Sequence, residues 1–509
     1  MAEYDFIVAG TGSAGAALSA RLSENPDVSV LTLEAGGADI PENVHNPSIW
    51  YTLLGSEVDW KYFSVPQPAL DGRKTFEPRG KIPGGSSNFY IMMHIRGHRS
   101  DYDNWAYNGC PGWGYDDCLP YFQKLEDQED TTNPTAGHGG AISVINAKNH
   151  HPHPTSAAFI ESCKELGFPE TDDFNGPNML GVGWHHMNIK DGQRFSTREG
   201  YVVPAASRPN YTLSTNSYVT RLTFDGTRCT GVEYVKDGVP TSAKARREVI
   251  VCGGAIESPH ILLNSGIGPA AQLQSFGIPV VVDLPGVGEN FHNHVLTGVI
   301  HECRDPQPPP TNNLSEAALF LTSEPGWPAP DLQIAFVHVP FNVIVGQGHP
   351  NSISIIPGVV RPLSRGWVRL GSADPLAPPL INPNYLGARS DLERLKQGVA
   401  LARDIFAAPS FSKIVASELM PGPDYGTSDA DLTRFVRATA ESYHHQAGAC
   451  RMGLDEMTVV SPRLKVWGVE GLRVADASVM PAVPSGNCHT GIVMIAERLA
   501  DFLKADHGL

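Results

Sequence analysis

The chain has 509 residues, of which 41% are hydrophobic and 18% charged, a balance that excludes a disordered polyelectrolyte and allows a large buried core. At roughly 150 residues per domain, this length predicts two to four domains. The 38 basic and 54 acidic residues give a net charge of −16 at pH 7, without a basic cluster, so we expect no nucleic-acid partner.

Cysteine usage and targeting signals predict the compartment. The eight cysteines are scattered without a C-x-x-C pair, which argues against a disulfide framework and against a zinc ribbon. The N-terminus enters a strand-like run at once, without the basic and apolar regions of a signal peptide. Apolar stretches fall short of the roughly 20 residues that span a bilayer. We therefore expect a cytoplasmic protein with reduced thiols and no transmembrane segment.

Histidines are numerous (19), and His150, His151 and His153 form the run NHHPHP. Acidic or cysteine residues at metal-ligand spacing do not accompany this run. We therefore predict no metal site and interpret the run as a solvated loop.

The first forty residues have the order of a dinucleotide-binding unit: strand, glycine turn, helix, strand and acid. Residues 4–9 predict the first strand, residues 16–23 the helix and residues 28–33 the second strand. The turn reads GTGSAG over residues 10–15, and Glu34 closes the second strand. Such a unit binds the pyrophosphate of a dinucleotide, and the motif fits FAD as well as NAD.

Each residue type in this unit has a physical role. Gly10 permits the tight turn, Gly12 lets backbone N–H groups approach a pyrophosphate, and Gly15 allows the helix to pack closely on the strand. The helix N-terminus supplies a favourable dipole for the phosphates. Glu34, nineteen residues after Gly15, is placed to accept hydrogen bonds from the adenosine ribose.

Five further segments carry recognisable patterns. They are RGKIPGGSSNFYIMMHIRGHRSDYD (79–103), GAIESPHILLNSGIG (254–268), RPLSRGWVRLGSADPLAPP (361–379), SYHHQAGACRMG (442–453) and LRVADASVMPAVPSGNCHTGIVMIAE (472–497). Together with the N-terminal turn, and in this order, they resemble the signatures of the glucose–methanol–choline (GMC) flavoprotein oxidoreductase family over nearly the whole chain. The resemblance implies FAD as the cofactor, with its isoalloxazine between an FAD domain and a substrate domain.

The resemblance also implies an α/β fold: a discontinuous Rossmann-like FAD-binding domain and an α+β substrate-binding domain with an antiparallel sheet. We place the FAD-binding domain at residues 1–155, 190–300 and 445–509, and the substrate-binding domain at residues 156–189 and 301–444. Within the first of these, residues 211–224 and 231–237 alternate in the way expected of antiparallel strands.

The family's FAD-contacting positions carry over to this chain residue by residue. The implied contacts are Gly10, Thr11, Gly12, Ser13, Ala14, Gly15, Glu34, Ala35, Trp60, Gly80, Gly84, Gly85, Asn88, Val219, Asp476 and Ala477. Two neighbouring positions depart from the family pattern. Members with covalent flavin place a histidine where this chain has Phe89, so we expect non-covalent FAD. The family usually has asparagine or histidine where Tyr90 stands, and a flavin contact is not assigned there.

Two histidines match the family's catalytic positions. By resemblance, His445, three residues before Gly448, is the active-site base, although His444 is adjacent to it. His489 matches the position that is normally asparagine or histidine. A neutral imidazole, with an ordinary pKa near 6.5, is suited to take the hydroxyl proton of an alcohol near neutral pH.

We therefore expect an FAD-dependent enzyme that oxidises an alcohol, most simply a primary alcohol, to a carbonyl and returns the electrons to oxygen or another acceptor. An alternative is a non-redox lyase of the hydroxynitrile-lyase type on the same scaffold. A third hypothesis, a non-catalytic FAD-binding protein, is disfavoured by the retained histidines. The alcohol, the electron acceptor and the oligomeric state are left open by the sequence.

Overall fold

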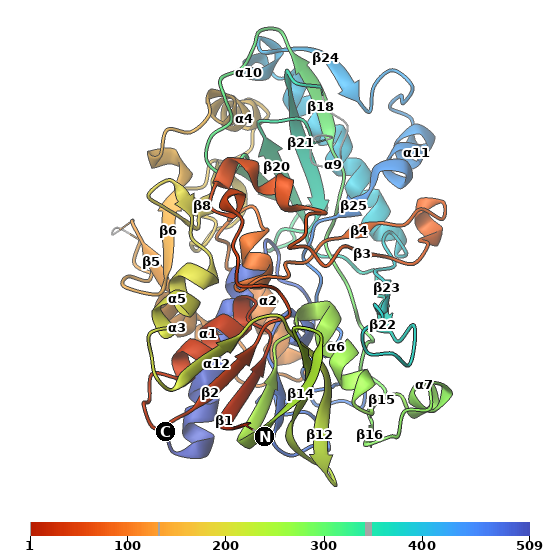
Figure 1. Ribbon diagram of the computed structural model, residues 1–509. Helices are drawn as coiled ribbons and strands as arrows, with labels where there is room; N and C mark the ends of the chain where they lie inside the picture. The colour runs from red at the N-terminus through yellow and green to blue at the C-terminus, as the bar shows by residue number, and fades with distance from the viewer. Residues whose placement is uncertain (1, 131–132, 342–348) are drawn as a thin grey trace.

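The computed structural model describes residues 2–130, 133–341 and 349–509, and its two large sheets lie in opposite halves of the molecule (Figure 1). The half that holds both chain termini is built around a mainly parallel sheet, and the other half around an antiparallel sheet. This arrangement confirms the predicted fold class.

The first sheet has the strand order β11-β2-β1-β14-β13-β12, with β26 beside β14. Its strands are β1 (Ala2–Ala9), β2 (Val30–Leu33), β11 (Tyr211–Ser214), β12 (Ser217–Asp225), β13 (Arg228–Lys236), β14 (Val239–Val251) and β26 (Leu472–Val474). β11, β2, β1, the end of β14 and β26 pair in parallel, whereas β12, β13 and the start of β14 form an antiparallel extension. The parallel strands end at one edge of the sheet, where Gly10 and Glu34 follow β1 and β2.

The helices of this half include α1 (Ser13–Leu22), which completes the predicted strand–turn–helix–strand unit. The others are α2 (Arg99–Tyr107), α3 (Tyr115–Leu125), α5 (Val203–Ala205), α6 (Gly254–Asn264), α7 (Ala270–Ser275) and α12 (His489–His507). α1 packs against α12, the C-terminal helix, and α12 packs against α3. The first and last helices of the chain therefore lie side by side.

The prediction that residues 211–224 form one antiparallel strand is wrong. The run is divided, because Asn216 adopts a left-handed conformation (φ 51°), which asparagine tolerates better than most residues. The part before the break, β11, pairs in parallel with β2, and the part after it, β12, pairs antiparallel with β13.

The second sheet has the order β24-β18-β21-β20-β19-β7, with β17 joining β21 to β25. Its strands are β7 (Gly181–Trp184), β17 (Val295–Leu296), β18 (Val299–Cys303), β19 (Ala317–Leu321), β20 (Leu332–Val337), β21 (Ser352–Val359), β24 (Val415–Met420) and β25 (Glu441–Ser442). All its pairings are antiparallel. The helices of this half are α4 (Pro154–Glu165), α9 (Arg389–Ala407), α10 (Pro409–Ser412) and α11 (Asp429–Thr439).

Both faces of the second sheet are buried, and alternate residues of each strand serve different purposes. On β20, Ile334 and Phe336 pack into the core shared with α4 and α9, while Ala335 and Val337 belong to a separate apolar cluster on the opposite face. That second cluster forms the wall of a cavity described below. Because successive side chains of a strand point to opposite faces, one face of β20 packs into the core and the other lines the cavity.

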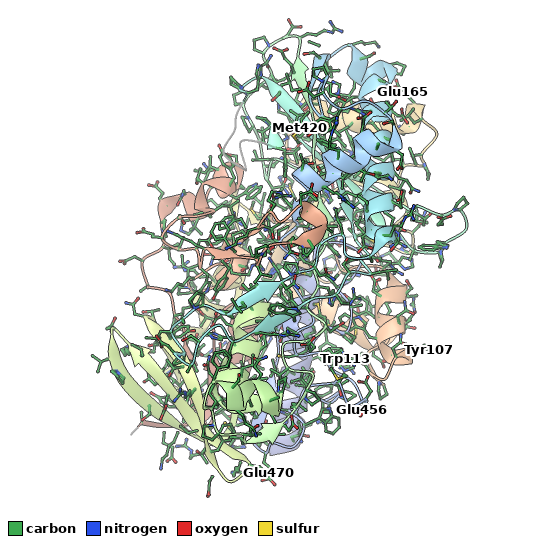
Figure 2. The ribbon with its side chains drawn as sticks, turned by 90° about the vertical axis from the view of Figure 1, so that its right-hand side faces the viewer. Tyr107, Trp113, Glu165, Met420, Glu456 and Glu470 are labelled. Atoms are coloured by element: carbon green, nitrogen blue, oxygen red, sulfur yellow. The ribbon has the colours of Figure 1, made fainter. Side chains whose placement is uncertain are left out.

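Short paired strands complete the fold. They are β3 (Tyr62–Phe63) with β4 (Phe76–Glu77), β5 (Glu126–Gln128) with β6 (Ile142–Asn146) and β8 (His186–Met187), β9 (Ile189–Lys190) with β10 (Gln193–Arg194), β15 (Ile267–Gly268) with β16 (Val282–Asp283), and β22 (Trp367–Arg369) with β23 (Leu380–Asn382). Figure 2 shows Met420, at the end of β24, and Glu165 at one end of the molecule and Glu470 at the other. The domain boundaries at residues 155, 189, 300 and 444 stay a prediction.

Three further findings concern the cysteines, metal sites and membranes. All eight cysteines are free and buried. Within the described residues, no cluster of His, Cys, Asp and Glu is arranged to hold a metal ion, and no helix is long and apolar enough to cross a membrane.

His153, expected in a solvated loop, is buried instead. Its ring nitrogen accepts the backbone N–H of Thr155 and caps α4.

Candidate active site

A cleft of about 940 Å³ opens at the edge where the parallel strands end. Twelve of the predicted FAD contacts line it: Gly10, Gly12, Ser13, Ala14, Glu34, Ala35, Trp60, Gly80, Gly85, Val219, Asp476 and Ala477. These residues come from the turns that follow β1 and β2, from α1 and β12, and from the segments at residues 60, 80–85 and 476–477, so the cleft gathers segments that lie far apart in the sequence.

The four other predicted contacts do not line this cleft but lie close behind it. The backbone oxygen of Thr11 accepts the N–H of Gly84 at 2.8 Å. Asn88 donates its side-chain amide to the carbonyl of Pro83 at 2.7 Å. A Cβ on Gly15 would lie 1.9 Å from the carbonyl oxygen of Gly10, so this glycine serves the close packing of α1 on the turn.

The N-terminus of α1 forms one wall of the cleft. Gly12 is its N-cap, no side chain caps the helix, and its first turn carries no acid. The first backbone N–H groups therefore lack helical partners, and with the helix dipole they favour an anion. A Cβ on Gly12 would meet no atom within 4 Å, so the backbone lies open to the cleft and a pyrophosphate fits against it.

Two glycine segments meet beside this helix. A Cβ on Gly85 would lie 2.7 Å from the Cα of Gly12, and a Cβ on Gly80 would lie 2.4 Å from the carbonyl carbon of Gly85. Only glycines allow this approach, because any side chain would collide with backbone. The predicted second glycine-rich segment therefore completes the cleft together with the first.

Glu34 is held in place by the turn itself. Its carboxylate accepts the backbone N–H of Thr11 at 3.1 Å, a short hydrogen bond from the Thr11 hydroxyl, and the N–H of Gly36 at 2.8 Å. The same carboxylate lines the cleft. These hydrogen bonds hold the carboxylate in one orientation at the cleft.

A second cavity, of about 1310 Å³, lies between the cleft and the antiparallel sheet. Ser13, Arg79, Ser86 and Ile492 line both spaces, so the two are adjacent. Most of the wall is apolar, with residues from β17, β20 and β21 on the face opposite α9. Both predicted catalytic histidines line this cavity.

His445 is held by neighbours on three sides. Its Nδ1 lies 2.9 Å from Nδ1 of His294, its Nε2 lies 3.2 Å from the amide nitrogen of Asn487, and its backbone N–H donates to Asn293 at 2.8 Å. The ring stacks on Tyr443 with centroids 4.8 Å apart. Both ring nitrogens of His445 therefore have a neighbour, a second imidazole at Nδ1 and the Asn487 amide at Nε2.

His489 is the first residue of α12. Its Nδ1 lies 3.0 Å from the hydroxyl of Ser13, the first residue of α1, while its Nε2 has no hydrogen-bond partner among the described residues. No side chain caps α12. The positive end of the helix dipole therefore lies at His489, beside the cavity.

Burial keeps these imidazoles neutral. Loss of hydration holds the pKa of His445 well below its ordinary value, and the neighbouring His294, His444 and Arg79 lower it further. Burial also lowers the pKa of His489, of His294 and of His444 to about 3 in each case. Near neutral pH, the histidines of this cavity are therefore uncharged bases.

His444, the competitor of His445, also lines the cavity but is held differently. It adopts a left-handed conformation (φ 64°), its carbonyl accepts a hydrogen bond from Arg79 at 2.8 Å, and its Nδ1 has no partner among the described residues. His444 therefore lacks the ring contacts that orient His445.

Phe89 and Tyr90 both line the cavity. Phe89 has no atom that can bond to a flavin. The Tyr90 hydroxyl donates to Asn188 at 2.6 Å, and its ring lies 4.5 Å from that of His489. Where the family usually has asparagine or histidine, this chain thus has a ring packed against a catalytic candidate.

Sequence reasoning missed several lining residues. In the cleft these include Tyr62, Arg79, Tyr218 and Gly253, and in the cavity they include Trp50, Phe341 and Asn487, with His294 behind His445. Arg79 and Asn487 lie in the segments 79–103 and 472–497 that resemble family signatures, so their position in the sequence could have indicated a place in the site. His294 had none, because its role arises only from its contact with a residue 151 positions away.

The family profile described as GMC oxidoreductase matches residues 4–296, and its C-terminal profile matches residues 362–496. Mitochondrial choline dehydrogenase of Mus musculus is 40% identical, covering 100% of this chain and 90% of that protein. Oxygen-dependent choline dehydrogenase of Chromohalobacter salexigens is 38% identical, covering 99% of this chain and 95% of that one. Since one name specifies mitochondria, the cytoplasmic location stays a prediction.

Solved structures give the same result. Pyridoxine 4-oxidase from Mesorbium loti superimposes with a TM-score of 0.94 at 32% identity, covering 99% of this chain and 100% of that one. Formate oxidase of Aspergillus oryzae RIB40 superimposes with a TM-score of 0.92 at 28% identity, covering 100% of this chain and 99% of that one. With the cleft described above, these matches show that the chain belongs to the GMC oxidoreductase family and is an FAD-dependent oxidoreductase.

Proposed function

We propose that this enzyme oxidises the hydroxyl-bearing carbon of an alcohol to a carbonyl, with His445 as the base and His489 as the residue that orients the oxygen. One observation carries the proposal: His445 and His489, from different segments, line one cavity that adjoins the cofactor cleft. The names of the relatives supply choline and pyridoxine as examples of the alcohols involved.

The cofactor contacts follow from the cleft. The N–H groups at the start of α1 and the open backbone of Gly12 would hold the pyrophosphate, and Glu34 would hold the ribose. When bound, FAD supplies the acceptor for the hydride that leaves the carbinol carbon. Because Phe89 has no atom that can bond to the flavin, FAD would be held without a covalent bond to the protein. The electrons then pass to oxygen or another acceptor.

His445 would take the hydroxyl proton at Nε2. The O–H bond breaks, its electron pair moves to form the C=O bond, and the carbinol C–H bond breaks with loss of hydride. His294 acts through His445: by engaging Nδ1, it fixes the ring and the tautomer that leaves Nε2 basic. Asn487, at 3.2 Å, would hold the same nitrogen until substrate displaces it.

His489 would hold the substrate oxygen from the other side. Its Nδ1 is engaged by Ser13, and its unpartnered Nε2 is free to meet the oxygen. The N-terminus of α12 adds a positive dipole where negative charge develops on that oxygen. Orientation by His489 and proton transfer to His445 therefore act on one atom.

Substitution of two glycines should separate effects on FAD affinity from effects on the stability of the fold. In Gly12→Ala the new methyl meets no protein atom but enters the cleft, so FAD affinity should fall by about tenfold while the melting temperature of the apoprotein stays close to that of the wild type. In Gly15→Ala the methyl collides with Gly10, so stability should fall by about 1–3 kcal/mol. FAD titration and thermal melting of both variants check this. Unchanged FAD affinity in Gly12→Ala would contradict the pyrophosphate assignment.

The cofactor should leave the denatured protein. Because Phe89 offers no linkage atom, acid or heat precipitation should release all the flavin into the supernatant as FAD. The check is absorbance and chromatography of both fractions, and flavin that stays with the washed polypeptide would refute non-covalent binding.

Substitutions should separate the histidines by role. His445→Ala should slow anaerobic flavin reduction by about 10²–10⁴-fold, which is the usual contribution of positioned proton transfer. His489→Asn keeps a hydrogen-bonding group and should retain more activity than His489→Ala. His444→Ala is the matched control. Loss of reduction in His444→Ala with a normal rate in His445→Ala would move the base by one residue.

The pH profile should reflect the lowered pKa of His445. A base whose pKa is lowered keeps its free electron pair into more acidic solution, so the rate of flavin reduction should stay level through pH 6.5 and fall only well below it. Stopped-flow reduction at saturating alcohol across the stable pH range measures this limb. An acid limb at or above the ordinary imidazole pKa would contradict an uncharged, buried base.

A further inference from the structure

Most of the side chains that line the substrate cavity are apolar. Away from the histidines it is lined by large apolar groups, including Trp50, Phe89, Leu296, Val337 and Phe341. These residues come from η2 (Pro47–Leu53), from the residue after η4 (Gly85–Asn88), from β17 and β20 of the antiparallel sheet, and from the segment that follows β20. Such a wall stabilises apolar surface by excluding water.

One carboxylate, Glu441, lines the cavity, and it is already paired. The Arg73 guanidinium forms a short ion pair with it and also donates to the carbonyl of Ala440. Burial raises the pKa of Glu441 to about 7, against the opposing effect of Arg73. Glu441 is therefore a weak counter-ion for anything inside the cavity.

The other charged group of the wall is a cation. Arg79 lines both the cavity and the cofactor cleft, and no carboxylate of the described residues lies within ion-pair distance of it. Its donors reach the carbonyls of Pro78 and His444. Arg79 is therefore a positive charge on the cavity wall without an ion-pair partner among the described residues, which disfavours a second cation beside it.

The residues outside the described ranges supply no further acid as a counter-ion. The residues outside the described ranges are Met1, Thr131, Thr132 and the run NVIVGQG at 342–348, and none of them has an ionisable side chain. An acid for a cationic substrate would therefore have to come from residues that are already placed, and only Glu441 among them lines the cavity.

Aromatic rings are the other means of holding a quaternary ammonium. Among the described residues, six aromatic side chains line the cavity: Trp50, Phe76, Phe89, Tyr90, Phe341 and Tyr443. Of these, Tyr90 and Tyr443 lie against the catalytic candidates and are already engaged. His489 lies against Tyr90 at 4.5 Å, with the Arg194 guanidinium 5.8 Å from the same ring, and His445 stacks on Tyr443 at 4.8 Å. A cage at the reactive end of the cavity would have to displace these contacts.

We propose that the alcohol oxidised here is uncharged and apolar beyond its hydroxyl group, and that a quaternary ammonium alcohol such as choline is a poor substrate. This inference rests on the proposed alcohol oxidation. It would distinguish the substrate of this chain from the choline in the names of its relatives.

A matched pair of alcohols tests it with the holoenzyme. Choline and 3,3-dimethyl-1-butanol have the same shape, but carbon replaces the charged nitrogen in the second. In anaerobic stopped-flow reduction, 3,3-dimethyl-1-butanol should exceed choline by about 100-fold or more in rate constant over dissociation constant, since the ammonium would be buried without a partner. Choline equal to or better than its neutral analogue overturns the inference.

A second pair tests the role of Arg79. Benzyl alcohol should be oxidised in preference to 4-(hydroxymethyl)benzoate, because Arg79 lies at the cofactor junction and the wall beyond it is apolar. Preference for the benzoate would assign Arg79 to an anionic substrate and overturn the inference. If none of the four alcohols reduces the flavin, the proposed oxidation itself fails.

Introducing a charge into the wall supplies a converse test. Leu54 lines the cavity, is half-buried and follows the end of η2. Relative to Leu54→Gln, Leu54→Glu should raise the preference for choline over 3,3-dimethyl-1-butanol by about tenfold. An unchanged ratio in a folded, FAD-loaded Leu54→Glu would show that charge in the wall does not set selectivity and would overturn the inference.

Discussion

The site depends on one long-range hydrogen bond, between the hydroxyl of Ser13 and Nδ1 of His489 at 3.0 Å. Ser13 begins α1 and His489 begins α12, so the bond joins the N-termini of helices that are 476 residues apart in the chain. α1 and α12 pack side by side, and this packing brings the cofactor cleft against the substrate cavity. A phosphate and a reacting oxygen would then each lie at the positive end of a helix.

The second catalytic candidate is positioned by a different device, a buried polar network. Among the described residues Glu77 has no ion-pair partner; it accepts hydrogen bonds from Tyr385 and Ser442 and a short one from Gln446. Burial raises its pKa, in spite of those hydrogen bonds. Ser442 in turn accepts from Asn293, whose oxygen receives the backbone N–H of His445. The loop around His445 is therefore held by a buried network of hydrogen bonds.

What the sequence predicted well was local. The first strand, its glycine turn, the helix and Glu34 lie within forty residues, and the physical reasons for Gly10, Gly12 and Gly15 apply to short-range packing that the structure reproduces. The split of residues 211–224 was missed because its cause is a single asparagine in a left-handed conformation, which leaves the strand-like composition unchanged.

What the sequence could not provide was long-range. His294 follows an unremarkable run and acquires a role only by contact with His445. The apolar cavity wall uses one face of β20 and β21, whereas the other face packs on α9, and the sequence of two strands buried on both sides does not tell these faces apart. The charge state of Glu441 likewise depends on Arg73, which lies 368 residues away.

The central claim is that this cavity removes a proton and a hydride from an alcohol. Anaerobic flavin bleaching with an alcohol and with its form deuterated at the carbinol carbon tests this most directly. The account predicts bleaching, formation of the carbonyl product in equal amount, and a slower rate with deuterium, because the C–H bond breaks in that step. A flavin that stays oxidised while an alcohol is cleaved, as a lyase would do, or bleaching with no isotope effect and no carbonyl, would contradict it.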